Sequence, residues 1–304
     1  MVRHGLRRAF SVVELIVVLA VLGMLASLAL VGLQHARAAA MRTRCSANLQ
    51  QMGTAVHQFA SNRRTLPGDD GSFLLQLLPF SESAAMSRDP HVRDREELLR
   101  RTHIPLFTCP ADAAPYIFEG SSNGYAGVNY VGNSGTWFIK TGFDGVFRYR
   151  AYGPPVSLAD IRDGASNTGL ICEALRGDLS FDRLRSNLQT NHQFQYPSEL
   201  DDFASHCKSV PPSDAIHGWL GDPGSKGTPW TITNVCITLY NHVLTPNLPS
   251  CFNGGDVVSG AATVSSFHPR GVNLLYVDGH VAFVTDRIES SIWRSIGTVS
   301  DTRR

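Results

Sequence analysis

Three ionisable residues near the C-terminal end of this sequence are of the types that perform acid–base chemistry or bind metals. His268 precedes Asp278 and His280, and imidazoles beside a carboxylate can act as a general acid–base pair or as metal ligands. Asp278 is followed by Gly279 between two β-rich runs, so a turn already explains it. A His near a strand end is more often a structural group. With no His-Glu-x-x-His motif and no phosphate-binding loop in the chain, we expect no catalytic residue and no enzymatic activity.

Acidic residues elsewhere are candidates for calcium. Asp160, Asp163 and Asp256 carry the hard carboxylate oxygens that Ca²⁺ binds. The spacing of an EF-hand loop is absent, and Asp side chains at such positions usually cap turns. We therefore expect turn caps and no resident metal, with calcium as the weaker alternative.

The six cysteines are an even number, which disulfides could use outside the cytoplasm. Fifteen pairings can be drawn, and the sequence does not choose among them. We prefer Cys45 with Cys109, while Cys172 lies in an apolar run and reads as a small buried hydrophobe. A second bridge is expected among the three C-terminal cysteines, Cys207, Cys236 and Cys251. No Cys-x-x-Cys spacing is present, which argues against a structural zinc site.

The elements that would position these residues are clearest at the end of the chain. Residues 272–277 and 280–284 are β-rich runs joined by Asp278-Gly279. Asp-Gly between such runs predicts a hairpin with a type I′ turn, in which both turn residues have positive φ. His268 would start the first strand or lie in the turn that leads into it.

The rest of the chain after residue 62 predicts mostly β structure with many turns. The sequence contains 27 Gly and 16 Pro, and only 17% of its residues are charged. Residues 169–173 predict a strand, residues 96–101 a solvated helix, and residues 178–260 a variable, loop-rich insertion with small hairpins. The net charge of +1 gives no indication of a nucleic-acid partner.

The N-terminal region contains a charge-free apolar run from residue 15 to residue 33. Its twelve Leu, Ile and Val residues favour membrane insertion by about −4 to −7 kcal/mol in total. Its nineteen residues, at about 1.5 Å each, nearly match a hydrocarbon core of about 30 Å. A single membrane span at about residues 13–33 is therefore expected. The arginines on its two sides nearly balance, and we place the short basic N-terminus in the cytoplasm.

Two other interpretations compete with a membrane span. A cleavable secretory signal would also begin with basic residues, and residues 36–38 offer a small-x-small cleavage site, but the apolar core of a signal usually has only about 7–15 residues. A buried core helix would also be apolar on all sides, but its place at the extreme N-terminus behind three arginines argues against it.

The helix is expected to continue beyond the membrane as a stalk. Residues 34–62 contain no Pro and one Gly, and apolar residues recur at spacings of four and three. This spacing places one apolar stripe on a helix, which we expect to pack on the globular domain. The stripe consists of Cys45, Leu49, Met52, Val56 and Phe59.

The segment from Arg7 to Glu14, with the apolar run behind it, resembles the N-terminus of type IV prepilins and type II secretion pseudopilins. The resemblance implies that a prepilin peptidase cleaves after Ala9 and leaves Phe10 as the mature, methylated N-terminus. It also implies that Glu14 neutralises the amine of Phe10 on a neighbouring subunit. Prepilins usually carry Gly before the cut, and Ala9 is the next smallest residue.

Five motifs occur in order along the chain. The last is His268, nine residues, and then Asp278-Gly279; the others are residues 45–53, 109–112, 125–130, and 163–168 with Glu173. Together they resemble a large family of prepilin-like bacterial proteins that carry a domain of unknown function. The resemblance implies a secreted-side domain on a pilin stalk, within secretion or pilus machinery. It implies no ligand and no catalytic residues.

The sequence therefore predicts an α+β protein in which a pilin-like helix packs on a mostly antiparallel, loop-rich domain. We expect a leader at residues 1–9, the helix at residues 10–62 and the globular domain at residues 63–304. The expected function is that of a structural subunit in the inner membrane, with the domain on the periplasmic or outer side. Its expected partners are a prepilin peptidase, other pilin-like subunits and the lipid bilayer. The alternative is a single-pass surface protein that binds a ligand and does not polymerise.

Overall fold

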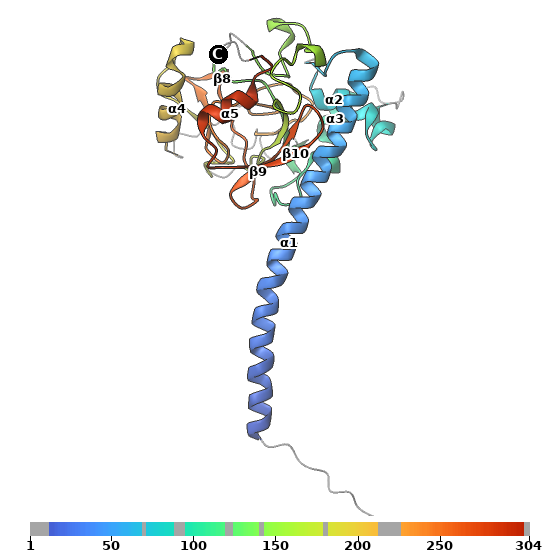
Figure 1. The fold of residues 1–304 in the computed structure, drawn as a ribbon, viewed down its shortest axis with the longest axis vertical. Coiled ribbons are helices and arrows are strands. Elements are labelled where there is room, and N and C mark those ends of the chain that lie inside the picture. Colours follow the sequence, from blue (N-terminus) through green and yellow to red (C-terminus); the bar gives the residue numbers. More distant parts are fainter. Residues whose placement is uncertain are drawn as a thin grey trace, which may run out of the picture.

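One helix, α1 (Val12–Arg63), extends from a rounded body, and its N-terminal half stands free of that body (Figure 1). The chain is represented by a computed structural model that describes residues 12–68, 71–87, 95–118, 124–139, 143–178, 182–211 and 226–300. The helix has 52 residues, which corresponds to a length of about 78 Å. Its most apolar window has a mean hydropathy of 2.8 and none of it is buried, so α1 is long and apolar enough to cross a membrane.

The C-terminal half of α1 packs on the body through the expected stripe. Cys45, Leu49, Met52 and Val56 are completely buried there, and Phe59 is partly buried against the same core. This half of the helix contacts two neighbouring strands, β9 (Gly271–Tyr276) and β10 (Val281–Thr285). The prediction of a long helix with one packing stripe is therefore confirmed.

The body is built around a five-stranded sheet in the order β10-β9-β4-β3-β6. All neighbouring strands are antiparallel except β3 and β6, which are parallel. The strand expected at residues 169–173 is the central one. The three strands not yet delimited are β3 (Tyr130–Asn133), β4 (Gly169–Glu173) and β6 (Leu239–Tyr240).

Both faces of the sheet are covered, which explains why every residue of β4 and β9 is buried. Successive side chains of a strand point to opposite faces. The side chain of Leu275 lies beside Gly53 of α1, whereas Leu274 lies on the other face together with Ile296 of α5 (Ser290–Gly297). The sheet thus lies between the stalk helix and α5.

The C-terminal hairpin forms as expected, but its turn type differs from the prediction. β9 and β10 pair antiparallel, and only Gly279 of the Asp-Gly pair has a positive φ, of 95°. The backbone N–H of Gly279 donates to the carbonyl of Tyr276. Asp278 instead accepts hydrogen bonds from the backbone and ring of His280. The loop is therefore longer than the two-residue turn expected, and within the Asp-Gly pair only the glycine adopts the αL conformation.

The region predicted as a loop-rich insertion contains a second core. Three of its strands form a sheet in the order β5-β7-β8, and the helix α4 (Leu200–Ser209), which the sequence did not predict, packs its buried residues Phe203 and Cys207 into this core. A disulfide joins Cys207 to Cys251. The strands are β5 (Asn187–Gln189), β7 (Ser250–Asn253) and β8 (Asp256–Ala261).

Short elements complete the body beside the upper part of α1. The solvated helix expected at residues 96–101 is α3 (Arg95–Arg101), in which Arg100 and Arg101 pair with glutamates one turn earlier. Residues 73–77 form a short helix, α2 (Phe73–Leu77), that begins at a Ser72 cap. A two-stranded ribbon consists of β1 (Ile117–Phe118) and β2 (Tyr125–Ala126).

Candidate functional site

A disulfide between Cys45 and Cys109 ties α1 to the body, and it is the pair that the sequence favoured. Cys45 lies on the buried stripe of α1, and Cys109 follows a 3₁₀ turn at Pro105–Phe107. Both side chains are buried. Of the other four cysteines, Cys172 and Cys236 are free and buried.

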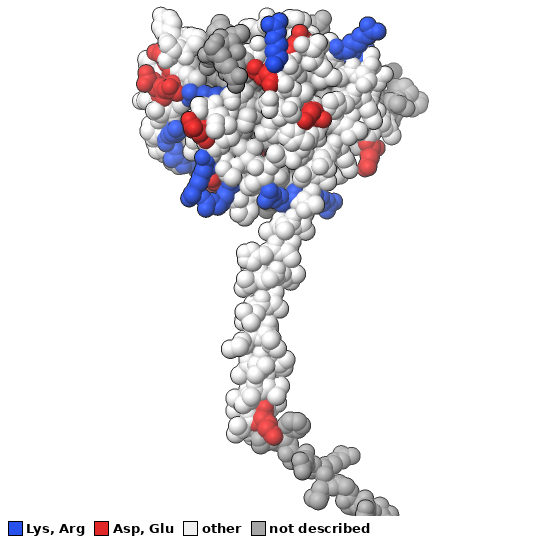
Figure 2. All heavy atoms as spheres, in the orientation of Figure 1, with Lys and Arg blue, Asp and Glu red and all other residues white. Residues whose placement is uncertain are grey.

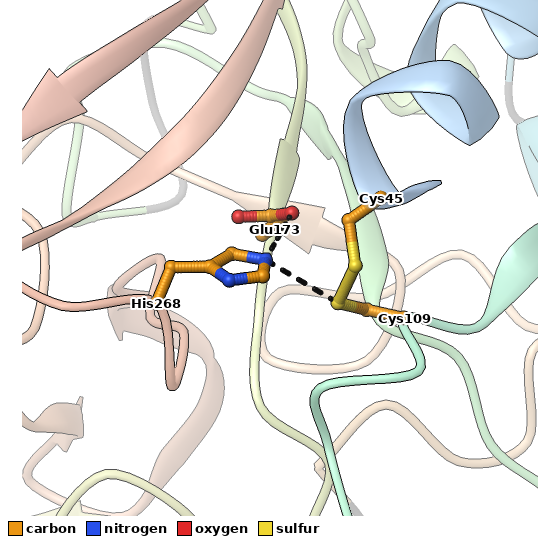
Figure 3. A group of neighbouring side chains, drawn as sticks. All are labelled: Cys45, Cys109, Glu173 and His268. Carbon is orange, nitrogen blue, oxygen red and sulfur yellow. Dashed lines mark hydrogen bonds and ion pairs between the residues drawn. A yellow bond between two sulfur atoms is a disulfide. The ribbon is translucent and has the colours of Figure 1, made fainter. Parts of the chain in front are cut away.

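His268 lies against this disulfide. It precedes β9, and its backbone N–H donates to the Ser266 hydroxyl at 3.0 Å. Its Nε2 atom is 3.6 Å from the Sγ of Cys109 and 3.3 Å from the Oε1 of Glu173, so the ring points between the sulfur and the carboxylate (Figure 3). The expected position of His268, in the turn leading into the hairpin strand, is confirmed.

Glu173, at the end of the central strand, completes the group. Its side chain is only 2% exposed, and a buried carboxylate needs hydrogen-bond donors to offset its lost hydration. Asn273 supplies two of them, because its backbone N–H donates to Oε2 at 2.8 Å and its side-chain amide donates to Oε1 at 2.9 Å. Glu173 was recognised in the sequence only as part of a motif, without a role.

These four side chains form one compact cluster, which we call the buried cluster: Cys45, Cys109, Glu173 and His268. One ligand atom of each lies within 4.8 Å of those of the others, and all four residues are buried. As drawn in Figure 3, two of the members are joined as a disulfide. In this state the cluster is a covalent and polar link between stalk and sheet, and its burial leaves no room for a substrate.

A second buried polar group lies beside it and was missed in the sequence. The carboxylate of Asp112 accepts from Arg185 at 2.6 Å and lies 3.4 Å from the Nε of Arg176. Burial alone would raise the pKa of Asp112, but the two guanidinium groups outweigh it and hold this pKa below its ordinary value. In the sequence, this group was indicated only by the presence of an acidic residue, Asp112, in the motif at residues 109–112.

Asn129 connects the two groups. Its Oδ1 accepts the backbone N–H of Cys109 at 3.0 Å, and its amide donates to Asp112 at 2.7 Å and to the carbonyl of Ala174 at 2.9 Å. The hydroxyl of Tyr130 donates to the carbonyl of Cys45 at 3.3 Å. Motifs that are far apart in the sequence are therefore held in one hydrogen-bonded network.

The hairpin turn lies apart from the buried cluster. Asp278 and His280 form an exposed pair at 2.6 Å, whereas His268 is buried against Glu173, so these three residues do not form one catalytic or metal group. The turn contacts the motif at residues 163–168, because the backbone N–H of Asp278 donates to the carbonyl of Ala165 at 3.1 Å.

The carboxylates of the three calcium candidates accept hydrogen bonds from within the chain, and Asp160 caps a helical turn. Asp160 closes a capping box with Ser157, and hydrogen bonds from the Ser157 backbone and hydroxyl lower its pKa. Asp163 accepts from the Thr298 hydroxyl at 2.8 Å. Asp256 accepts from the Ser259 hydroxyl and from the backbone two residues ahead.

An open groove runs between α1 and the hairpin turn. It has a volume of about 560 Å³, and its lining includes Gln50, His57, Asp278 and Gly279. The Nε2 of His57 is buried there without a hydrogen-bond partner among the described residues.

The residues expected to direct processing lie at the start of the chain. Ala9 and Phe10 are outside the described residues. Glu14 lies in the first turn of α1 as described, on the free half of the helix.

The fold and the site together define a class of protein: an α+β body held on an apolar, membrane-length helix by a buried cross-link. The chain belongs to the family described as "Protein of unknown function (DUF1559)", whose model matches residues 34–291. This match begins directly after the apolar run at residues 15–33. No curated protein and no solved structure matches the chain.

Proposed function

We propose that this chain is a non-enzymatic, pilin-like structural subunit, anchored in a membrane by α1 and assembled with other pilin-like subunits. The observation that carries the proposal is the contrast between the two halves of α1. The C-terminal half is buried in the body, whereas the N-terminal half exposes its large apolar side chains, with Met24 70% and Leu28 67% exposed. An apolar surface of this length requires lipid or neighbouring helices to cover it.

The bilayer is the first partner in this proposal. The free half of α1 presents almost entirely uncharged surface, and Lys and Arg side chains gather on the underside of the body around the point where the helix enters (Figure 2). Basic groups at that level would lie near lipid headgroups. The two disulfides support a location of the body on the periplasmic or outer side, where disulfides persist.

The other partners are a prepilin peptidase and further pilin-like subunits of a type II secretion or type IV pilus-like assembly. Cleavage after Ala9 would expose the amine of Phe10. In the assembly, Glu14 on one subunit would neutralise that amine on the next, since an acid within an apolar helix is costly to bury unless it is paired.

A non-enzymatic role is supported by the burial of the polar cluster. His268 and Glu173, the acid–base pair of the buried cluster, have side chains only 3% and 2% exposed. A general acid or base must come within hydrogen-bond reach of a substrate. We therefore assign this pair to structure and not to turnover.

The experiment compares Glu14→Ala with Glu96→Ala in cells that contain a prepilin peptidase. Glu96 is an exposed acid on α3 and serves as the matched control. We expect the intact mass of both proteins to show a chain that begins at Phe10. The Glu14 variant should lose at least about tenfold in subunit–subunit cross-linking, because the Phe10 amine is then left unpaired among apolar helices, at a cost of more than about 1.4 kcal/mol. Equal cross-linking of the two variants would contradict the role of Glu14.

A second candidate function is a single-pass binding protein that does not polymerise. The groove beside His57 favours it, because it is open, of ligand size and contains an imidazole nitrogen that has no hydrogen-bond partner within the described part of the chain. A chain that keeps Met1, stays in the membrane and yields no cross-links to copies of itself would support this candidate and oppose assembly. A start near Ala39 would instead indicate a secreted protein.

A further inference from the structure

We infer that the buried cluster is a zinc site in the chain whose Cys45–Cys109 disulfide has been reduced. The inference rests on geometry and donor chemistry, and it does not depend on filament assembly. In the dithiol state the cluster offers two thiolates, one imidazole nitrogen and one carboxylate oxygen, a donor set that suits tetrahedral Zn²⁺.

The distances already present match two edges of a zinc tetrahedron. With Zn–N and Zn–O near 2.0–2.1 Å and Zn–S near 2.3 Å, tetrahedral angles give an N···S separation of about 3.6 Å and an N···O separation of about 3.4 Å. The Nε2 of His268 lies 3.6 Å from the Sγ of Cys109 and 3.3 Å from the Oε1 of Glu173. Reduction removes the bond that holds the two sulfurs together and lets Cys45 occupy the fourth corner.

The surroundings also fit a metal site. The metal-facing nitrogen is Nε2, which points between the sulfur and the carboxylate (Figure 3). Asn273 donates to both oxygens of Glu173, and such outer hydrogen bonds orient carboxylate ligands. The four ligands come from four separate segments of the chain, so zinc would fasten α1 to the body as the disulfide does.

The chemistry balances with a dithiol reductant. The reductant gives two electrons and two protons to the disulfide, which becomes two thiols, and is itself oxidised to a disulfide. Zn²⁺ then displaces the two thiol protons to solvent. With two thiolates and the Glu173 carboxylate the occupied site carries one net negative charge, which faces the Asn273 donors.

The test uses the full chain in detergent, reduced, freed of reductant and kept anaerobic, with Co²⁺ and Zn²⁺ as probes. We expect one metal per reduced chain, with the sulfur-to-cobalt charge-transfer band and the visible bands of tetrahedral cobalt. The oxidised chain should bind none at this site. A reduced chain that binds neither ion, or that gives octahedral cobalt without charge transfer, would overturn the inference.

Two variants assign the metal to this cluster. Cys45→Ser removes one thiolate and should at least halve the charge-transfer intensity per chain, whereas Cys207→Ser, in the other disulfide, is the matched control and should leave the band unchanged. Glu173→Gln keeps the shape of the side chain but loses the anionic ligand, and should weaken zinc binding by more than the roughly 10–100-fold typical of an outer-shell change. Equal binding by the Cys45 variant and the control would place the metal elsewhere and refute the assignment.

A final measurement covers the case in which reduction loosens the fold. The thermal unfolding midpoint of the reduced wild-type chain should rise on addition of Zn²⁺, and that of reduced Cys45→Ser should rise much less. If zinc stabilises both chains to the same degree, the buried cluster is not its site.

Discussion

The side chain of Arg176 is completely buried, and its charged guanidinium group is paired and hydrogen-bonded. Its guanidinium lies against Asp112 and donates to the carbonyls of Asp112, Ala114 and Pro115. Burial lowers the pKa of Arg176 even though Asp112 opposes that shift. A buried ion pair of this kind adds little net stability, but it becomes costly when one partner is lost. Its main effect is to fix the segment before β1 against the segment that follows β4.

His242 makes stability depend on pH at the residue scale. It is fully buried and packed against Trp293 with its ring tilted by 37°, and burial lowers its pKa from 6.5 to about 3 despite a hydrogen bond to the Trp293 carbonyl. Between these values the unfolded chain binds the proton and the folded chain does not. Stability should therefore fall as the pH drops from about 6.5, by roughly 3 kcal/mol at pH 4 from this residue alone.

The measurement is the free energy of unfolding in denaturant at several pH values between 4 and 7. His242→Gln keeps hydrogen-bonding capacity but cannot titrate, so the slope of stability against pH should become shallower than in the wild type. His192→Gln, at an exposed position, is the matched control. A His242 variant with the slope of the control would show that this imidazole is not the source of the acid sensitivity.

At the scale of elements, the two halves of α1 differ in packing. Leu49 is completely buried and Leu28 is 67% exposed. Leu49→Ala should destabilise the body by about 2–5 kcal/mol because it leaves a cavity, whereas Leu28→Ala should change its stability by less than about 0.5 kcal/mol. Chemical unfolding of the full chain in detergent, followed by the fluorescence of the buried Trp230 and Trp293, distinguishes them. Equal losses would mean that the free half of α1 also supports the body.

Elements with a strong local pattern could be predicted from the sequence. The strand at Gly169–Glu173 and the stripe of α1 have the burial that their apolar residues indicated. The helix α4 was missed because its polar residues, such as Asp201 and Asp202, outnumber the few that pack into the second core. The turn type was wrong because the Asp-Gly signal does not report the side-chain bond from His280 to Asp278 that accompanies the longer loop.

The candidate site belongs to the scale of the whole molecule, and only part of it could be predicted. The Cys45–Cys109 pair was expected, but the contacts of His268 with Glu173 and Cys109 were not. These residues lie on four segments: Cys45 and Cys109 are 64 positions apart, and Cys109 and His268 are 159 positions apart. Local periodicity carries no information about which distant segments meet, so only the order of the motifs hinted at one network.

At the scale of the whole molecule, membrane anchoring and the stability of the body should depend on different halves of α1. Leu22→Lys places a charge in the exposed apolar half of α1, at a cost near 3 kcal/mol or more for membrane insertion. Retention in the membrane should therefore fall on the order of 100-fold, while the unfolding midpoint of the body stays unchanged. Gln50→Lys, an exposed position on the body half of the same helix, is the control and should affect neither. Membrane sedimentation after alkaline extraction, paired with unfolding of the solubilised protein, gives both readouts.

The position of Cys45 also decides how a mechanical pull would travel through the protein. Tension applied along the free half of α1 reaches Cys45 and crosses the disulfide to Cys109, from which the covalent path continues toward the C-terminus. Residues 46–108 lie outside that path. The buried half of the stalk helix is therefore not stretched when the anchor is pulled, and its stripe cannot be peeled from the sheet one turn at a time. A pull on the membrane helix therefore enters the body at Cys109.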